Sequence, residues 1–308
     1  MKELLISTQT SGWLNPLFGE ARITEAFEFI KECGFEALDY NLDTKLIPAQ
    51  INKSDKGTFY TKSIDEILEY YVPIKEALTK SGLVMGQAHA PFPLFRRTDE
   101  EYSEYLIEAL EKCIAVCKFL DIPAIVTHPC NYLDRDNEKK CNLELFRRVI
   151  PMALDSGVKI CLENIPNVCN GHVVNGVCCT PEEAVWYIDT LNAEAGKDIF
   201  GFCFDLGHAN ITGANVKYFI RALGDRLTCM HLHENDGVSD QHYAPMTQRK
   251  TDWNGLVDGL REINYKGTIN FESCASLMKE YPKELFSDML VYTSAVGRYL
   301  RNKILEER

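Results

Sequence analysis

The chain alternates short apolar runs with longer amphipathic segments, and this alternation limits the folds open to it more than any other feature. Runs rich in β-branched and aromatic residues are typical of strands, whereas apolar residues spaced three and four apart are typical of helices. Eight predicted strands begin near Leu4, Ala37, Val84, Ala124, Lys159, Phe200, Leu227 and Thr268. Eight predicted helices occupy residues 21–33, 63–80, 99–119, 143–155, 181–193, 215–223, 253–263 and 283–304. Strands and helices in this order predict a (β/α)8 TIM barrel, formed as a single domain by residues 1–308.

Local residue choices support these boundaries. Thr180, Pro181 and Glu183 stand where a helix start favours an N-cap, a proline at the first position and a glutamate at the third. Gly34 and Gly82 follow two predicted helices, as expected for a left-handed C-cap. The competing fold is an open doubly wound sheet, but neither a GxGxxG motif nor a P-loop follows the first predicted strand.

Charge and composition restrict the class of partner. The chain has 33 Lys and Arg against 45 Asp and Glu, a net charge of −12, which disfavours a large nucleic-acid interface because phosphates are bound by clustered basic residues. No stretch approaches the ~20 apolar residues of a membrane span, and the first apolar run is too short for a signal peptide. We therefore expect a cytoplasmic protein whose 12 cysteines are free thiols.

Histidine and acidic residues end six consecutive predicted strands. They are His89, His128, Glu163, Asp205 with His208, His231 with His233, and Glu272. Because the carboxyl ends of barrel strands meet at one mouth, these side chains are expected to lie close together. Crowded carboxylates repel one another unless a cation or a proton lies between them. The pattern therefore predicts a divalent metal site, and its oxygen-rich ligands suit Mn²⁺, Mg²⁺ or Co²⁺, with Zn²⁺ as a further alternative.

These residues carry a resemblance to a known family. The segments are Leu162-Glu163-Asn164, Asp205-x-x-His208-Ala209, His231-Leu232-His233-Glu234-Asn235-Asp236-Gly237, Asp240-Gln241-His242 and Phe271-Glu272-Ser273. Together they resemble the xylose-isomerase-like TIM-barrel superfamily, from the first strand to the last helix. That superfamily holds sugar and sugar-phosphate isomerases and epimerases, together with endonuclease IV.

The resemblance implies a metal-dependent isomerase or epimerase. One divalent metal, Mn²⁺ first, would be held by Glu163, Asp205, His231 and Glu272. His233 points to the same side of its predicted strand as His231 and remains the alternative ligand. Glu163 and Glu272 would also move the substrate proton through an enediolate, which fits the acidity that a metal gives to a neighbouring C–H group.

The remaining polar residues at the mouth are expected to bind the substrate, a sugar or sugar phosphate. They are His89, His128, His208, His233, Asp240 and His242. Gly237 stands where many ketose epimerases of this group carry an arginine, six residues after the metal histidine. No membrane partner is expected, and a homodimer is an assembly that the resemblance allows.

Two alternative activities belong to the same superfamily. Endonuclease IV uses three zinc ions to cleave abasic DNA, and each of its ligand positions has a counterpart here: His89, His128, Glu163, Asp205, His208, His231, Asp240, His242 and Glu272. The net charge of −12 and the lack of a basic loop argue against this activity. The second alternative is a metal-dependent dehydratase.

A long loop follows the strand that contains Glu163. Residues 166–179 contain the turn pairs Asn170-Gly171 and Asn175-Gly176 around a short apolar run. Such pairs favour a tight hairpin, so we expect a small hairpin lid beside Glu163.

Overall fold

The computed structural model describes residues 4–306, and its main sheet closes on itself. Eight strands pair in parallel in the order β10-β1-β2-β3-β4-β5-β8-β9. Leu232, just after β9, accepts a hydrogen bond from the Glu272 amide at 3.1 Å and donates its own amide to Asn270 at 2.9 Å, which joins β9 to β10. The strands are β1 (Ile6–Gln9), β2 (Ala37–Asn41), β3 (Val84–His89), β4 (Ala124–Thr127), β5 (Lys159–Glu163), β8 (Phe200–Asp205), β9 (Leu227–His231) and β10 (Ile269–Phe271). The predicted barrel is confirmed.

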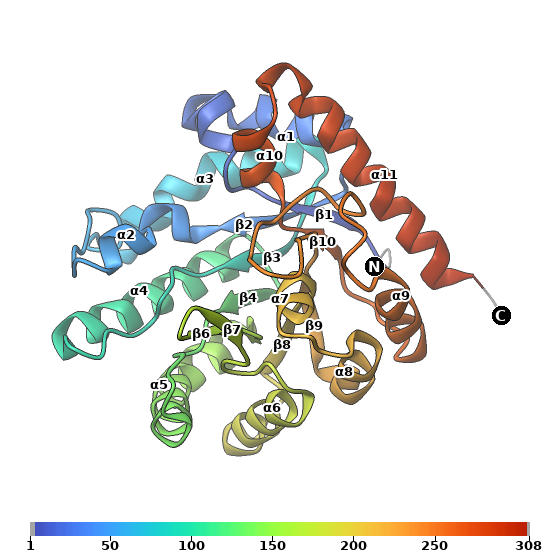
Figure 1. The fold of residues 1–308 in the computed structure, drawn as a ribbon. Coiled ribbons are helices and arrows are strands. Elements are labelled where there is room, and N and C mark those ends of the chain that lie inside the picture. The colour runs from blue at the N-terminus through green and yellow to red at the C-terminus, as the bar shows by residue number, and fades with distance from the viewer. Residues whose placement is uncertain (1–3, 307–308) are drawn as a thin grey trace.

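Eight longer helices surround these strands, as Figure 1 shows. They are α1 (Ile23–Glu32), α3 (Ile64–Ser81), α4 (Glu100–Phe119), α5 (Arg135–Ser156), α6 (Pro181–Ala195), α8 (Val216–Leu223), α9 (Trp253–Glu262) and α11 (Phe286–Leu305). Each corresponds to a predicted helix. Only α5 begins much earlier than predicted, because its first turns are polar and bury Glu138 and Asn142 instead of an apolar stripe.

The predicted helix boundaries have the expected cap geometry. The Thr180 hydroxyl accepts a hydrogen bond from the Glu183 amide at 3.4 Å, and Pro181 begins α6. Gly82 ends α3 in the left-handed conformation, with a φ of 68°. Gly34, after α1, has a φ of 96°. Each helix therefore ends where the chain must turn toward the next strand.

Three short helices have no apolar periodicity long enough to predict them. They are α2 (Pro48–Ile51), α7 (Leu206–Ile211) and α10 (Cys274–Glu280). The helix α7 starts at Asp205, whose Oδ1 accepts a hydrogen bond from the His208 amide at 2.6 Å. The spacing between Asp205 and His208 is therefore that of a helix cap, which places both side chains at the mouth of the barrel.

The loop after β5 forms the predicted hairpin. Its antiparallel strands are β6 (Asn167–Cys169) and β7 (His172–Val174). Asn170 and Gly171 make the turn with φ values of 51° and 79°, which match the two positive angles of a type I′ turn. The second predicted pair is not part of this turn. Gly176 instead passes so close to the Ile165 carbonyl that a Cβ atom would lie 2.2 Å from it.

All 12 cysteines are unpaired, and ten of them are buried. Within residues 4–306, none of the helices is both long enough and apolar enough to span a lipid bilayer.

Candidate metal centre

The six predicted strand ends meet at the mouth of the barrel. His89, Glu163, Asp205 and His231 are the last residues of β3, β5, β8 and β9. His128 and Glu272 follow directly after β4 and β10. All six except the partly exposed His128 and Glu272 are buried. Parallel pairing therefore brings together side chains that lie far apart in the sequence.

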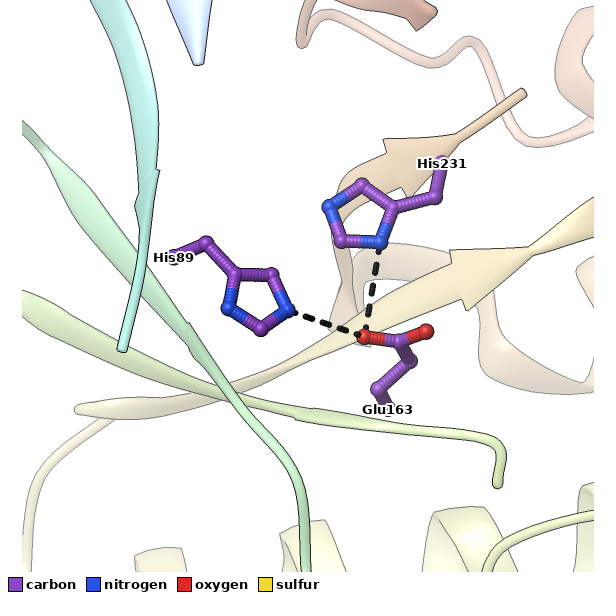
Figure 2. A group of neighbouring side chains, drawn as sticks. All are labelled: His89, Glu163 and His231. Carbon is purple, nitrogen blue, oxygen red and sulfur yellow. Dashed lines mark ion pairs between the residues drawn. The ribbon is translucent and has the colours of Figure 1, made fainter. Parts of the chain in front are cut away.

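Glu163 lies at the centre of the group and is only 1% exposed. Its Oε2 atom is 3.3 Å from His128 Nε2, 3.4 Å from His231 Nδ1 and 3.9 Å from His89 Nε2. Its Oε1 atom is 3.2 Å from His208 Nδ1. Figure 2 shows the rings of His89 and His231 both directed at the same carboxylate oxygen of Glu163.

Glu272 completes the first ligand group at the same nitrogen of His231 that Glu163 approaches. Its Oε2 atom is 3.2 Å from His231 Nδ1, so this one nitrogen faces both glutamates. Asp205, His231 and Glu272 offer ligand atoms within 4.8 Å of one another, and so do His89, Glu163 and His231. This spacing could hold a metal ion.

A second group lies beside the first and is centred on Asp240. The Asp240 Oδ2 atom is 3.3 Å from His208 Nε2 and 3.2 Å from His242 Nε2. The ring of His233 stacks on that of His242 at 3.8 Å, and its Nε2 atom lies 3.1 Å from Asp205 Oδ2. Six of the seven histidines of the chain therefore surround this mouth.

The structure separates the two candidate ligand histidines. His231 faces Glu163 and Glu272, whereas His233 faces Asp205 and Asp240. The geometry favours His231 as the partner of both glutamates.

Three buried atoms of the first group make no hydrogen bond. They are Glu163 Oε2 and both ring nitrogens of His231, Nδ1 and Nε2. A buried polar atom without a partner is costly, so native proteins rarely keep one unless an ion or a water satisfies it. Two carboxylates and an imidazole with free lone pairs suit a divalent cation, and the residues present therefore fit a metal.

Burial and neighbouring charges separate the two glutamates. Burial raises the pKa of Glu272 to about 8, with Glu163 and Asp205 acting in the same direction against His231 and His242. Burial also opposes ionisation of Glu163, but the nearby His231 and His128 outweigh it and hold the pKa of Glu163 well below its usual range. The metal-free centre thus favours one ionised and one protonated glutamate.

The ligand groups open into a cavity of about 280 Å³. On the side of the two ligand groups, the cavity is lined by His89, His128, Glu163, His208, Asp240, His242 and Glu272. Phe92 and the β1 and β2 ends contribute the other wall, with Gln9, Ser11, Asn41 and Asp43. Of the predicted substrate-binding residues, His233 is the one that does not line the cavity. Its side chain is fully buried.

The sequence prediction missed the contribution of β2. Asp39 is 1% exposed, and its Oδ2 atom lies 3.2 Å from His231 Nε2. One feature of the sequence could have indicated this contribution: Asp39 is a single carboxylate within the otherwise apolar start of the second predicted strand, Ala37-Leu38-Asp39-Tyr40. The predicted site contained residues from the third to eighth predicted strands and from the loop after the seventh, but none from the second.

Residues 27–288 match the family described as xylose isomerase-like TIM barrel. The chain belongs to this family. A protein named probable endonuclease 4 of Mycoplasma mycoides is 22% identical over 220 residues, which cover 67% of this chain and 71% of that one. An uncharacterized protein of Methanocaldococcus jannaschii is 27% identical over 198 residues, 60% of this chain and 63% of that protein's length.

Solved structures share the fold over nearly the whole chain. A D-tagatose 3-epimerase-like protein superposes with a TM-score of 0.68 at 20% identity, covering 98% of each chain. D-psicose 3-epimerase and L-ribulose 3-epimerase are among the other structures of similar fold. The chain thus shares its fold with proteins named as sugar epimerases and is similar in sequence to one named probable endonuclease 4.

Proposed function

We propose that this protein is a divalent-metal-dependent isomerase or epimerase of a sugar or sugar phosphate, which acts by proton transfer through an enediolate. The observation that carries the proposal is the pair of glutamates that flank one histidine nitrogen, at 3.4 Å for Glu163 and 3.2 Å for Glu272. Both line a cavity of the size of a small molecule. The fold shared with sugar epimerases supports the same reaction class.

The metal would be held by Glu163, Asp205, His231 and Glu272. When bound, a divalent ion supplies a Lewis acid that polarises a substrate oxygen and acidifies the neighbouring C–H group. Mn²⁺ is the first choice because three of the four ligands are carboxylates; Zn²⁺, Co²⁺ and Mg²⁺ are the alternatives.

The two glutamates would hold and move the proton. A base must be ionised at the operating pH, and His231 and His128, acting against burial, hold the pKa of Glu163 low enough for that role. Glu272 would be a second base once a metal ion has displaced its proton. The proton would leave the substrate carbon for one carboxylate and return from the same or the other one. Return from the opposite face gives epimerisation, and return at the adjacent carbon gives isomerisation.

The surrounding histidines would orient the substrate. His89, His128, His208 and His242 present ring nitrogens around the cavity, and Asp240 holds two of these rings. Imidazole and carboxylate groups hydrogen-bond the hydroxyls of a polyol from several directions. Phe92, whose ring lies 4.3 Å from that of His128, would give one apolar wall.

Solvent deuterium exchange tests the proposal. The Mn²⁺-loaded protein should incorporate deuterium into at least one member of a panel of ketoses, aldoses and their phosphates. Glu163→Gln and Glu272→Gln should each abolish that exchange, whereas Glu138→Gln, a buried carboxylate on α5, should leave it intact. Exchange retained in either cavity variant removes that glutamate from its role, and no exchange with any sugar contradicts the function.

A metal-dependent phosphodiesterase is the second candidate, and the Asp240 group is the observation that favours it. His208, Asp240 and His242 give ligands for a further ion, and His89 and His128 lie beside Glu163. Three tightly bound zinc ions per chain with cleavage of abasic DNA would establish this activity. A single bound ion without cleavage would exclude it.

A further inference from the structure

Below the candidate metal centre, one buried carboxylate has no assigned role. We propose that Asp39 is a positioning residue, which fixes the ring of His231 so that the Nδ1 atom faces the metal. The proposal rests on the metal-dependent function above. Asp39 lies in the middle of β2 and outside the cavity lining, so it would act through His231 rather than on the substrate.

The two nitrogens of His231 have different surroundings. Nε2 lies 3.2 Å from Asp39 Oδ2, whereas Nδ1 lies 3.2 Å from Glu272 Oε2 and 3.4 Å from Glu163 Oε2. The ring is fully buried, and neither nitrogen makes a hydrogen bond within the described residues, so the approach to Asp39 is a contact with a charged group. A neutral imidazole carries one proton. If that proton is on Nε2, the nitrogen beside Asp39, the Nδ1 lone pair is directed between the two glutamates.

Asp39 is itself held in place by two amides. Gln87 Nε2, on β3, donates to Asp39 Oδ2 at 3.0 Å, and Asn270 Nδ2, on β10, donates to the same oxygen at 2.9 Å. Both amides are fully buried. The carboxylate is therefore fixed by strands on both sides of β2, and its negative charge points at the ring of His231.

This arrangement has a defined physical effect on a metal ligand. A carboxylate that accepts the second ring proton of a ligand histidine sets the tautomer and raises the basicity of the other nitrogen. Asp39 belongs to none of the ligand groups found among residues 4–306. The alternative role for Asp39 is purely structural, a link between β3, β10 and β9. That role predicts a loss of stability without a change in the choice of His231 nitrogen.

Two variants separate these roles. In Asp39→Asn, the side-chain oxygen can still accept from Gln87 and Asn270, so the shape is kept and only the charge is lost. Asp39→Ala removes the acceptor altogether. Glu138→Gln is the matched control, because this carboxylate is equally buried and accepts the Tyr132 amide at 2.7 Å, but it lies outside the cavity.

Mn²⁺ affinity is measured by calorimetry on the full chain, together with the thermal midpoint of each metal-free variant. Asp39→Asn should weaken Mn²⁺ binding about 10- to 100-fold and Asp39→Ala at least as much, with the control unchanged. In metal-free protein labelled with ¹⁵N-histidine, measured at a pH high enough for the ring of His231 to be neutral, that ring should carry its proton on Nε2, and Asp39→Ala should shift the proton toward Nδ1.

Unchanged affinity and an unchanged tautomer in both variants would overturn the proposal, even if the thermal midpoint falls. If wild-type protein binds no divalent ion, the metal function fails. The tautomer comparison still decides the role of Asp39, because it is made without metal.

Discussion

The interior of the barrel contains two neighbouring layers of side chains, which come from the same strands but differ in chemistry: a lower layer of cysteines and an upper layer of carboxylates and histidine. Strands alternate their side chains, so residues two apart share a face. On β5, β8 and β9, the pairs are Cys161 with Glu163, Cys203 with Asp205, and Cys229 with His231. The cysteines pack with Ala124 and Val126 into a small buried cluster, whereas their neighbours two residues later form the candidate metal centre. The layer that contributes packing and the layer of the proposed chemistry are thus adjacent, two residues apart along each strand.

The two layers differ in whether they contain buried charged groups. Burial raises the pKa of Cys203 well above the usual thiol range, and the contact with Cys161, together with burial, does the same for Cys229. The next layer contains Glu163 and Asp205, which are just as buried. The carboxylates are tolerated only because histidines, and by our proposal a cation, lie beside them.

The largest expected effect comes from neutralising the upper layer. Glu163→Gln should lower turnover by about 10³-fold or more, because it removes both a metal ligand and a proton-transfer group. Metal-free Glu163→Gln should unfold within a few degrees of the wild type, because the change is nearly isosteric. Steady-state kinetics and a thermal melt check these outcomes. A large drop in the melting midpoint with activity retained per folded molecule would reverse the proposed division of roles.

The converse change places a charge in the lower layer. Cys161→Asp should lower the free energy of unfolding by about 3–5 kcal/mol, because the new carboxylate has no cationic partner. Cys141→Asp, on the partly exposed side of α5, should cost no more than about 0.5 kcal/mol. Urea unfolding of both variants checks the difference. Equal costs at the two positions would show that the lower layer is not the apolar region described.

Metal removal should lower the stability of the fold through the upper layer alone, because the proposed ligands all lie there. At a Mn²⁺ concentration about 100 times the dissociation constant, binding should stabilise the fold by about 2.7 kcal/mol. For a chain of this length, that corresponds to a rise of about 4 °C in the melting midpoint. Melts after chelation and after Mn²⁺ addition measure this rise. Glu272→Gln should reduce it, and a full rise in that variant would remove Glu272 from the ligands.

The smallest effect concerns pH. Burial raises the pKa of Glu272 to about 8, so a metal ion must displace a proton below that pH. Below pH 8, apparent Mn²⁺ affinity should therefore rise by about tenfold per pH unit for the proton displaced from Glu272. Calorimetry over this range measures the slope. A slope that persists unchanged in Glu272→Gln would assign the proton to another group.

The sequence predicts the barrel and the upper layer well, because parallel strands necessarily bring their carboxyl ends to one mouth. His89, Glu163 and His231 could be placed together on that ground alone. The sequence could not distinguish His231 from His233, since residues two apart share a strand face. The structure separates them by their partners, because His231 Nδ1 faces both glutamates, whereas His233 Nε2 faces Asp205.

The residues that were missed act through neighbours rather than at strand ends. Asp39 precedes the end of β2 by two residues, and only the closed barrel brings it against His231. The short helices α7 and α10 were missed because one or two turns carry too little apolar periodicity. Their positions depend on the caps and on the packing of the finished barrel.

The most direct test of the account is a crystal structure of the Mn²⁺-soaked protein with anomalous diffraction data collected for manganese. The account predicts one strong peak between Glu163, Asp205, His231 and Glu272, with His231 Nδ1 directed at it. A map without a peak in this group, or with Mn²⁺ bound by His233 instead of His231, would contradict it.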